Sequence, residues 1–192
     1  YFVGIVMIDT LLAHRPQFRA PAIWSELNLK EKGYFVMTMH RPANEDEADK
    51  LRRFIAAITN SAGEFPVVFP IHPRTQKVFE TMGVSVSGLQ TVEPMGYLEF
   101  NYLVERCKAV ITDSGGITEE ATVMHVPCLT LRDNTERPET VTVGTNELVG
   151  TDPEKIAPAM ERVKTGQWKK GDIPDKWDGS AASRIVSRLL KF

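Results

Sequence analysis

The sequence lacks both the long apolar run of a membrane span and the charge imbalance of a nucleic-acid-binding protein. It contains no stretch of about 18 apolar residues, so no segment is expected to cross a bilayer. Its formal net charge is −2, and no basic stripe alternates with aromatic residues. With 192 residues, of which 42% are hydrophobic, the chain is expected to be an ordinary soluble globular protein with one core.

Cysteines, metal-binding histidine patterns and standard nucleotide motifs are also scarce. Cys107 and Cys128 lie in apolar segments without CxxC spacing, which favours a reducing cytoplasm and excludes the usual redox and zinc sites. The four histidines show no HxxxH or HxxE spacing, so no metal is expected. Neither GxGxxG nor GxxxxGK[ST] occurs, so neither a nicotinamide cofactor nor a P-loop is predicted, and we expect no cofactor.

The chain begins with the apolar segment YFVGIVMI. This segment has no basic n-region and no small-residue cleavage site, so we do not expect a signal peptide. A chain that begins inside an apolar strand is expected to be a piece of a longer protein.

Short apolar runs alternate with helical patterns along the chain. Strands are expected at residues 1–8, 33–40, 66–72, 89–94, 108–113 and 127–132. Between or after them, residues 51–58 and 156–163 carry apolar side chains at helical spacing. The alternation predicts a doubly wound parallel sheet, a Rossmann-like α/β fold. We expect a single nucleotide-sugar-binding domain over residues 1–192, ending in a helix over residues 179–192.

Polar residues follow the expected strands at the edge where such sheets bind ligands. These residues are His40 and Arg41, His72, Glu93, Asp113 with Ser114, and Arg132. Arg41 is a forked, permanently charged donor suited to phosphate, and His40 beside it can donate a hydrogen bond or move a proton near neutral pH. A lone histidine is more often a structural residue, and the residues beside His72 support a functional role less than those beside His40 do.

The segment ITDSGGITEEA, residues 111–121, runs from a strand into two glycines and a helix. Ser114, Gly115 and Gly116 would lie at the helix N-terminus, where free amides and the helix dipole favour a phosphate. Glu120 could accept two hydrogen bonds from the vicinal hydroxyls of a ribose. A structural interpretation remains open, with Ser114 as an N-cap and the glutamates as first-turn acids. A nucleoside diphosphate without the standard motifs suggests a sugar nucleotide.

A charged cluster, RDNTERPET, follows the strand expected at 127–132. It is either a surface group of ion pairs or a loop that presents Arg137 to a diphosphate or holds Glu120 in place.

Four motifs occur in a fixed order along the chain: TMHRPANED, EPMGYLEFNYLV, ITDSGGITEEA and RDNTERPETVTVGTNELVGTD. In this order they closely resemble the C-terminal half of the non-hydrolysing UDP-N-acetylglucosamine 2-epimerases. The resemblance runs from the first residues to the last helix and is most specific over residues 93–152. It implies one half of a glycosyltransferase-B arrangement of two Rossmann-like domains, with the substrate in the cleft between them.

The resemblance also implies a reaction and a role for each matching residue. The family interconverts UDP-N-acetylglucosamine and UDP-N-acetylmannosamine by elimination and re-addition of UDP, without a redox cofactor. By this resemblance, His40 would assist departure of UDP, and Ser114, Gly115 and Gly116 would bind phosphate. Glu120 would bind the ribose, Phe100 would contact the uridine, and Arg137 would contact the diphosphate. The family's acid/base carboxylates lie in its N-terminal domain, so this chain alone is expected to be inactive. Family members are usually dimeric through that other domain.

The sequence departs from the family pattern at two positions, and it leaves two alternative functions open. Ala43 stands where many members have Glu, and Met95 stands where others have Gln; either change could loosen a loop or alter a uracil contact. A glycosyltransferase-B donor-binding domain is the second enzyme hypothesis. A nucleotide-binding module without catalysis is the third.

Overall fold

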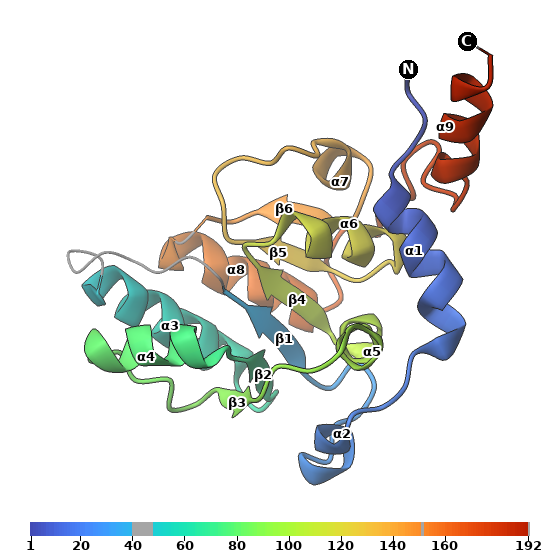
Figure 1. Ribbon diagram of the computed structural model, residues 1–192. Coiled ribbons are helices and arrows are strands. Elements are labelled where there is room, and N and C mark those ends of the chain that lie inside the picture. Colours follow the sequence, from blue (N-terminus) through green and yellow to red (C-terminus); the bar gives the residue numbers. More distant parts are fainter. Residues whose placement is uncertain (40–47, 151, 192) are drawn as a thin grey trace.

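One parallel sheet forms the centre of the computed structural model, which describes residues 1–39, 48–150 and 152–191 (Figure 1). Within these residues the sheet has six strands: β1 (Phe35–Thr38), β2 (Val67–Pro70), β3 (Gln90–Val92), β4 (Ala109–Thr112), β5 (Cys128–Thr130) and β6 (Asn146–Leu148). The strand order is β3-β2-β1-β4-β5-β6, and all neighbours are parallel. This is the Rossmann order, so the predicted doubly wound α/β fold is confirmed.

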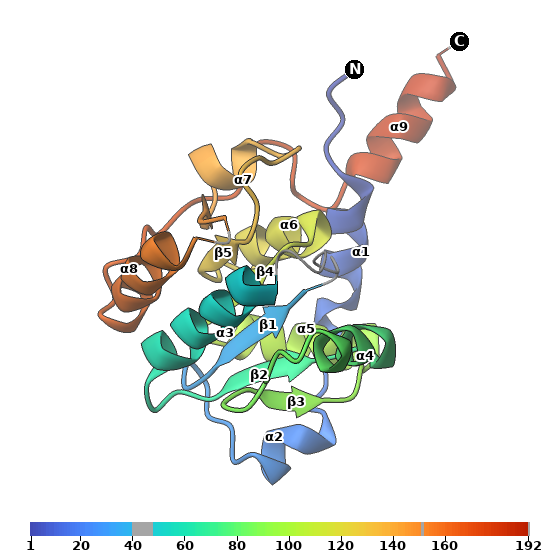
Figure 2. The same ribbon diagram turned by 90° about the vertical axis from the view of Figure 1, so that its left-hand side faces the viewer.

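Helices cover both faces of the sheet (Figure 2). The described helices are α1 (Val6–His14), the 3₁₀ turn η1 (Arg15–Gln17), α2 (Ala22–Glu26), α3 (Ala48–Ala62), α4 (Pro73–Thr81), α5 (Tyr97–Arg106), α6 (Gly115–Val123), α7 (Glu139–Thr142), α8 (Pro153–Lys164) and α9 (Ala181–Leu189). Helices α3 and α8 pack together, as do α1 and α6. None of the described helices is both long and apolar enough to cross a membrane.

Side chains that alternate along each strand divide the core into two layers. Phe35 of β1 joins Phe54 of α3 and Met160 of α8 on one face of the sheet. The next residue, Val36, joins the other layer together with Leu103 of α5. This two-residue period buries both faces of every central strand, which explains why the strands read as continuous apolar runs.

The first apolar segment differs from the prediction. The strand expected at residues 1–8 is wrong, because α1 begins at Val6 and continues to His14. Ile8 and Leu11 are completely buried on one side of α1, where they pack with the residues of α5 and α6. A short apolar run does not distinguish a strand from a buried helical segment, because both can consist entirely of apolar residues.

Strand β6 carries no apolar signal that would have predicted it. Its first residue, Asn146, is fully buried. The Asn146 Oδ1 accepts a hydrogen bond from Thr130 Oγ1 at 2.6 Å, and its Nδ2 donates to Thr140 Oγ1 at 3.2 Å. An asparagine is tolerated in this buried strand because both ends of its amide have partners.

The two ends of the chain lie side by side, and α9 projects away from the sheet (Figure 1). Helix α9 lies within residues 179–192, where we expect a helix. Its first amides are capped by α1, since Asp9 Oδ1 accepts from Ala181 N at 3.0 Å and Asp9 Oδ2 accepts from Ala182 N at 2.7 Å. Such amides have no intrahelical partner, so a carboxylate from a distant helix takes the place of a local N-cap.

Replacing Asp9 by Ala should loosen the start of α9. We expect a loss of about 1 kcal/mol in the free energy of unfolding, typical of a removed cap, and faster amide hydrogen exchange at Ala181 and Ala182. Asp49→Ala, which breaks an exposed ion pair with Arg52 on α3, is the matched control and should change stability by about 0.5 kcal/mol or less. Equal exchange at α9 in the two variants would contradict the capping role.

Candidate functional site

The sheet reverses its winding between β1 and β4. The chain builds β1, β2 and β3 outward in one direction and then returns to place β4 on the other side of β1. The last residues of the two central strands, Thr38 and Thr112, lie opposite each other. Crossover connections diverge at such a point, and the crevice that they leave beyond the strand ends is where these sheets bind ligands. The segment 113–116 begins at this point.

Threonine hydroxyls set the path of the chain from β4 into α6. Thr38 Oγ1 and Thr112 Oγ1 share a hydrogen bond of 2.6 Å, and both residues are buried. Thr112 Oγ1 also accepts from the backbone N–H of Ser114 at 3.0 Å. Because this contact occupies the Ser114 amide, the amides that face outward are those that follow it.

The glycine pair opens α6 with a bare backbone. Ser114 occupies the N-cap position, but its hydroxyl makes no capping hydrogen bond. A Cβ atom on Gly115 would meet nothing within 4 Å, whereas one on Gly116 would lie 2.9 Å from Cε of Met7 on α1. Helix-start amides lack intrahelical acceptors and carry the positive end of the dipole. The geometry therefore leaves Gly115 accessible to an anion, and it does not support Ser114 as a simple N-cap.

Glu120 follows the glycine pair on α6, four residues after Gly116, and is buried, with 6% of its surface exposed. Its Oε1 accepts a hydrogen bond from the Tyr97 hydroxyl of α5 at 2.7 Å. Burial raises the pKa of Glu120, while Tyr97 and the amide of Asn101 lower it. The interpretation of Glu119 and Glu120 as first-turn acids is wrong, because α6 begins at Gly115 and its first turn contains no acid; both glutamates are also buried.

Arg137 contacts the neighbouring glutamate. Its Nε donates to Glu119 Oε1 at 2.7 Å, so the suggestion that it holds Glu120 in place is wrong. Successive helical residues point about 100° apart, and Glu119 faces the loop of Arg137 while Glu120 faces α5. The Arg137 side chain is 46% exposed, which leaves it accessible to a ligand. The two adjacent glutamates of α6 therefore have different partners: Glu119 pairs with the loop of Arg137, and Glu120 pairs with α5.

The remaining predicted residues have three different outcomes. His40 and Arg41 lie outside the described residues. Phe100 is partly buried and packs against the core layer of α1, α5 and α6. His72 is a local N-cap of α4, because its Nδ1 accepts from Arg74 N at 3.3 Å. Within the described residues, no three His, Cys, Asp or Glu side chains are grouped to hold a metal ion.

Sequence reasoning missed the groups that support Glu120 and Ser114. These are Tyr97, Asn101, Thr38 and Thr112. Tyr97 and Asn101 are four residues apart on α5, so they share one helical face. Two polar residues at this spacing were the available sign that this face contacts a polar group. The two threonines gave no such signal, since strand threonines are common.

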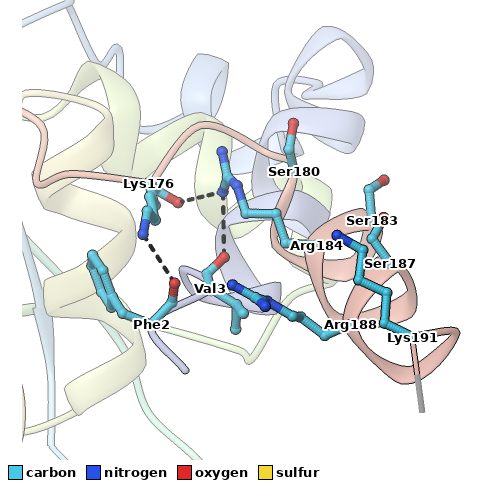
Figure 3. A pocket seen from close by; sticks show the side chains of 9 residues that line it. All are labelled: Phe2, Val3, Lys176, Ser180, Ser183, Arg184, Ser187, Arg188 and Lys191. Carbon is cyan, nitrogen blue, oxygen red and sulfur yellow. Dashed lines mark hydrogen bonds between the residues drawn. The ribbon is translucent and has the colours of Figure 1, made fainter.

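A hollow of about 330 Å³ lies elsewhere, between the N-terminal segment and α9 (Figure 3). Lys176 Nζ donates to the carbonyl of Phe2 at 3.0 Å, and Arg184 Nη1 donates to the carbonyl of Val3 at 3.3 Å. These cations hold the N-terminal segment against α9. The hollow is separate from the strand ends that form the candidate site.

Replacing Thr112 by Val should destabilise the fold while preserving the shape of the side chain. The valine leaves the Ser114 amide and the Thr38 hydroxyl without this partner, so we expect a loss of about 1–2 kcal/mol in unfolding free energy, measured by urea denaturation. Thr81→Val is the control, because its hydroxyl bonds only to the Lys77 carbonyl on the exposed side of α4. A loss as large in the control would contradict a special role for Thr112.

Three comparisons place the chain among known proteins. A family model described as UDP-N-acetylglucosamine 2-epimerase matches residues 1–190. The UDP-N-acetylglucosamine 2-epimerase of Methanocaldococcus jannaschii is 40% identical over 168 residues, which are 83% of this chain and 44% of that protein. The UDP-2,3-diacetamido-2,3-dideoxy-D-glucuronate 2-epimerase of Pseudomonas aeruginosa is 37% identical over 192 residues, 99% of this chain and 52% of that protein.

A solved structure agrees with these relatives. The M. jannaschii UDP-GlcNAc 2-epimerase in complex with UDP-GlcNAc and UDP has a TM-score of 0.78 and 34% identity to this chain, covering 98% of it and 54% of that protein. The chain spans about half the length of the curated relatives it matches. Since the family model covers nearly every residue, the chain belongs to the UDP-N-acetylglucosamine 2-epimerase family.

Proposed function

We propose that this chain is the C-terminal, UDP-binding part of an enzyme that interconverts UDP-N-acetylglucosamine and UDP-N-acetylmannosamine. The observation that carries the proposal is the open glycine start of α6 at the point where the sheet reverses, with a buried carboxylate on the same helix. Helix-start amides suit a pyrophosphate, and a carboxylate suits a ribose diol.

Each predicted residue has a place in this proposal. The hydroxyl of Ser114 and the backbone amides of Gly115 and Gly116 bind the pyrophosphate, and the half-exposed Arg137 guanidinium supplies a positive charge beside them. Glu120 accepts hydrogen bonds from the ribose hydroxyls. Phe100 contacts the uridine and His40 assists departure of UDP, as the family resemblance implies. Arg41, the forked cation beside His40, pairs with phosphate.

The proposed reaction needs a proton transfer at C2 of the sugar. Loss of the C2 proton and cleavage of the C1–oxygen bond release UDP and leave an unsaturated sugar. Return of a proton to the opposite face of C2 and re-addition of UDP at C1 complete the epimerisation. The residues described here hold the leaving group, so the proposal assigns the acid/base carboxylates to the other half of the protein.

The apolar face of α9 supports a second half of the protein as a partner. Val186, Leu189 and Leu190 of α9 are exposed, with Leu189 at 68%, and so are Tyr1 and Phe2 of the N-terminal segment, which packs against another side of α9. Exposed apolar residues at one end of the molecule indicate a surface that another protein domain covers. We propose that the missing half packs here, in a glycosyltransferase-B arrangement, and that any homodimer forms through that half. The buried, unpaired Cys107 and Cys128 favour a cytoplasmic location.

The sugar itself is the least constrained part of the substrate. The P. aeruginosa relative, which matches 99% of this chain, is named for a UDP-linked diacetamido sugar acid. This relative favours, as a second candidate function, a 2-epimerase of that UDP-sugar. Assaying the complete protein with both UDP-sugars separates the two, since only the true substrate should be converted.

Calorimetric titration of the chain with UDP tests the proposed binding function. We expect saturable binding that Arg137→Gln weakens about tenfold, because a charged contact to the diphosphate is lost while a donor for Glu119 remains. Arg162→Gln is the matched control, since Arg162 is another half-exposed arginine paired with a glutamate, Glu147. Absence of UDP binding, or equal losses in both variants, would count against the proposal.

A further inference from the structure

Two side chains of α5 flank the Glu120 carboxylate, one at the surface and one in the core. Tyr97 is 40% exposed and donates its hydroxyl hydrogen to Glu120 Oε1 at 2.7 Å. Asn101, one helical turn further along α5, is completely buried. The edge of the His14 ring lies against the Tyr97 ring, with 6.5 Å between ring centroids, and steadies it from α1.

Asn101 lacks the partners that a buried amide normally has. Neither its Nδ2 nor its Oδ1 forms a hydrogen bond with any of the described residues. Its amide is nevertheless close enough to Glu120 to lower the pKa of that carboxyl, although the contact falls short of hydrogen-bond geometry. A buried amide without partners costs stability, so its presence beside a carboxylate calls for an explanation other than packing.

We propose that Tyr97 and Asn101 are positioning residues that hold the Glu120 carboxylate toward the ribose diol of the bound nucleotide. This inference rests on the proposed function, because it assigns the ribose to Glu120. Tyr97 holds one carboxylate oxygen from the surface side, and the Asn101 amide closes onto the carboxylate from the core side when the nucleotide binds.

The physical reason is that a buried carboxylate needs donors to remain ionised. Burial and the nearby Glu119 raise the pKa of Glu120, and Tyr97 and Asn101 oppose this change by stabilising the charged form. Only the ionised carboxylate accepts hydrogen bonds from both ribose hydroxyls. A fixed carboxylate also loses less conformational entropy when the ribose binds.

The test compares the affinities of the chain for UDP and for 2′-deoxy-UDP. In the wild-type chain UDP should bind about tenfold more tightly, because one hydrogen bond to a charged acceptor is lost in the deoxy compound. In Tyr97→Phe and Asn101→Leu the preference should fall below about threefold, chiefly through weaker UDP binding. Tyr102→Phe removes a hydroxyl from the same helix at a ring that packs on Trp24, and it should keep the full preference.

Two further measurements separate positioning from a structural role. Asn101→Leu keeps the number and branching of the side-chain heavy atoms and removes both unpartnered polar atoms, so its unfolding temperature should be unchanged or higher. Titration of the ¹³C-labelled Glu120 carboxyl by NMR should give a higher pKa in Tyr97→Phe and in Asn101→Leu than in the wild-type chain, since each loses a donor to the charged form. A purely structural role would leave this pKa unchanged.

The outcome of Glu120→Gln distinguishes the two proposals. If it leaves UDP affinity unchanged, the ribose assignment and the positioning inference both fall. If it weakens UDP binding while Tyr97→Phe and Asn101→Leu keep the tenfold preference of the wild-type chain, only the positioning inference is overturned.

Discussion

Ser114→Trp should reduce the affinity of the chain for UDP by about a hundredfold or more, equivalent to roughly 2.7 kcal/mol. The indole would add a bulky group directly before Gly115, whose surroundings are open and where the proposal places the pyrophosphate. The fold should survive, because Ser114 is only partly buried, lies between β4 and α6, and has a hydroxyl that caps no amide. Calorimetric titration measures the affinity, and circular dichroism verifies that the variant is folded.

The control for this prediction introduces the same bulky side chain in the hollow beside α9. Ser183→Trp should leave UDP affinity unchanged, since that hollow is separate from the strand ends. The opposite pattern, with binding lost in Ser183→Trp and kept in Ser114→Trp, would move the nucleotide to the hollow and refute the proposed site.

Incubation of the chain alone with UDP-N-acetylglucosamine in D₂O should give neither epimer nor deuterium at C2. The two carboxylates beside the glycine pair are engaged, Glu120 by Tyr97 and Glu119 by Arg137, and neither is placed to remove a carbon-bound proton. General acid/base catalysis requires a carboxylate within hydrogen-bond reach of the proton that moves. Proton NMR of the recovered UDP-sugar measures both events.

A longer protein that contains this chain together with the proposed second half is the positive control for this assay. It should convert the substrate and incorporate deuterium at C2, since proton removal and return exchange with solvent. Epimerisation by the 192-residue chain alone would show that the proton-transfer groups are in this half, against the proposal.

The strand β4 and the start of α6 were predictable because their signals are local. A buried apolar strand followed by Ser-Gly-Gly and a helical pattern specifies a strand, a tight turn and a helix start within about a dozen residues. The start of α8 has a local signal of the same kind, an aspartate followed by a proline, and Asp152 does cap that helix. Local hydrogen bonds between near neighbours do not depend on the rest of the fold.

The surroundings of Glu120 were not predictable in this way. The Tyr97 hydroxyl comes from 23 positions earlier in the chain, and the Arg137 guanidinium that pairs with Glu119 comes from 18 positions later. Which of two adjacent glutamates each group reaches depends on the rotation of α6 against α5 and the following loop. Charge and spacing alone gave Arg137 two possible roles, and the contact with Glu120 was the wrong one.

For this protein, sequence pattern alone determined the parallel, doubly wound α/β class and the glycine helix start, because periodicity and turn chemistry act between near neighbours. Only the tertiary structure decided that the first apolar segment forms helix α1, that β6 is a strand and that Asn101 is buried beside Glu120. These three features depend on which surfaces meet when distant segments pack, and burial of a side chain is a property of that packing.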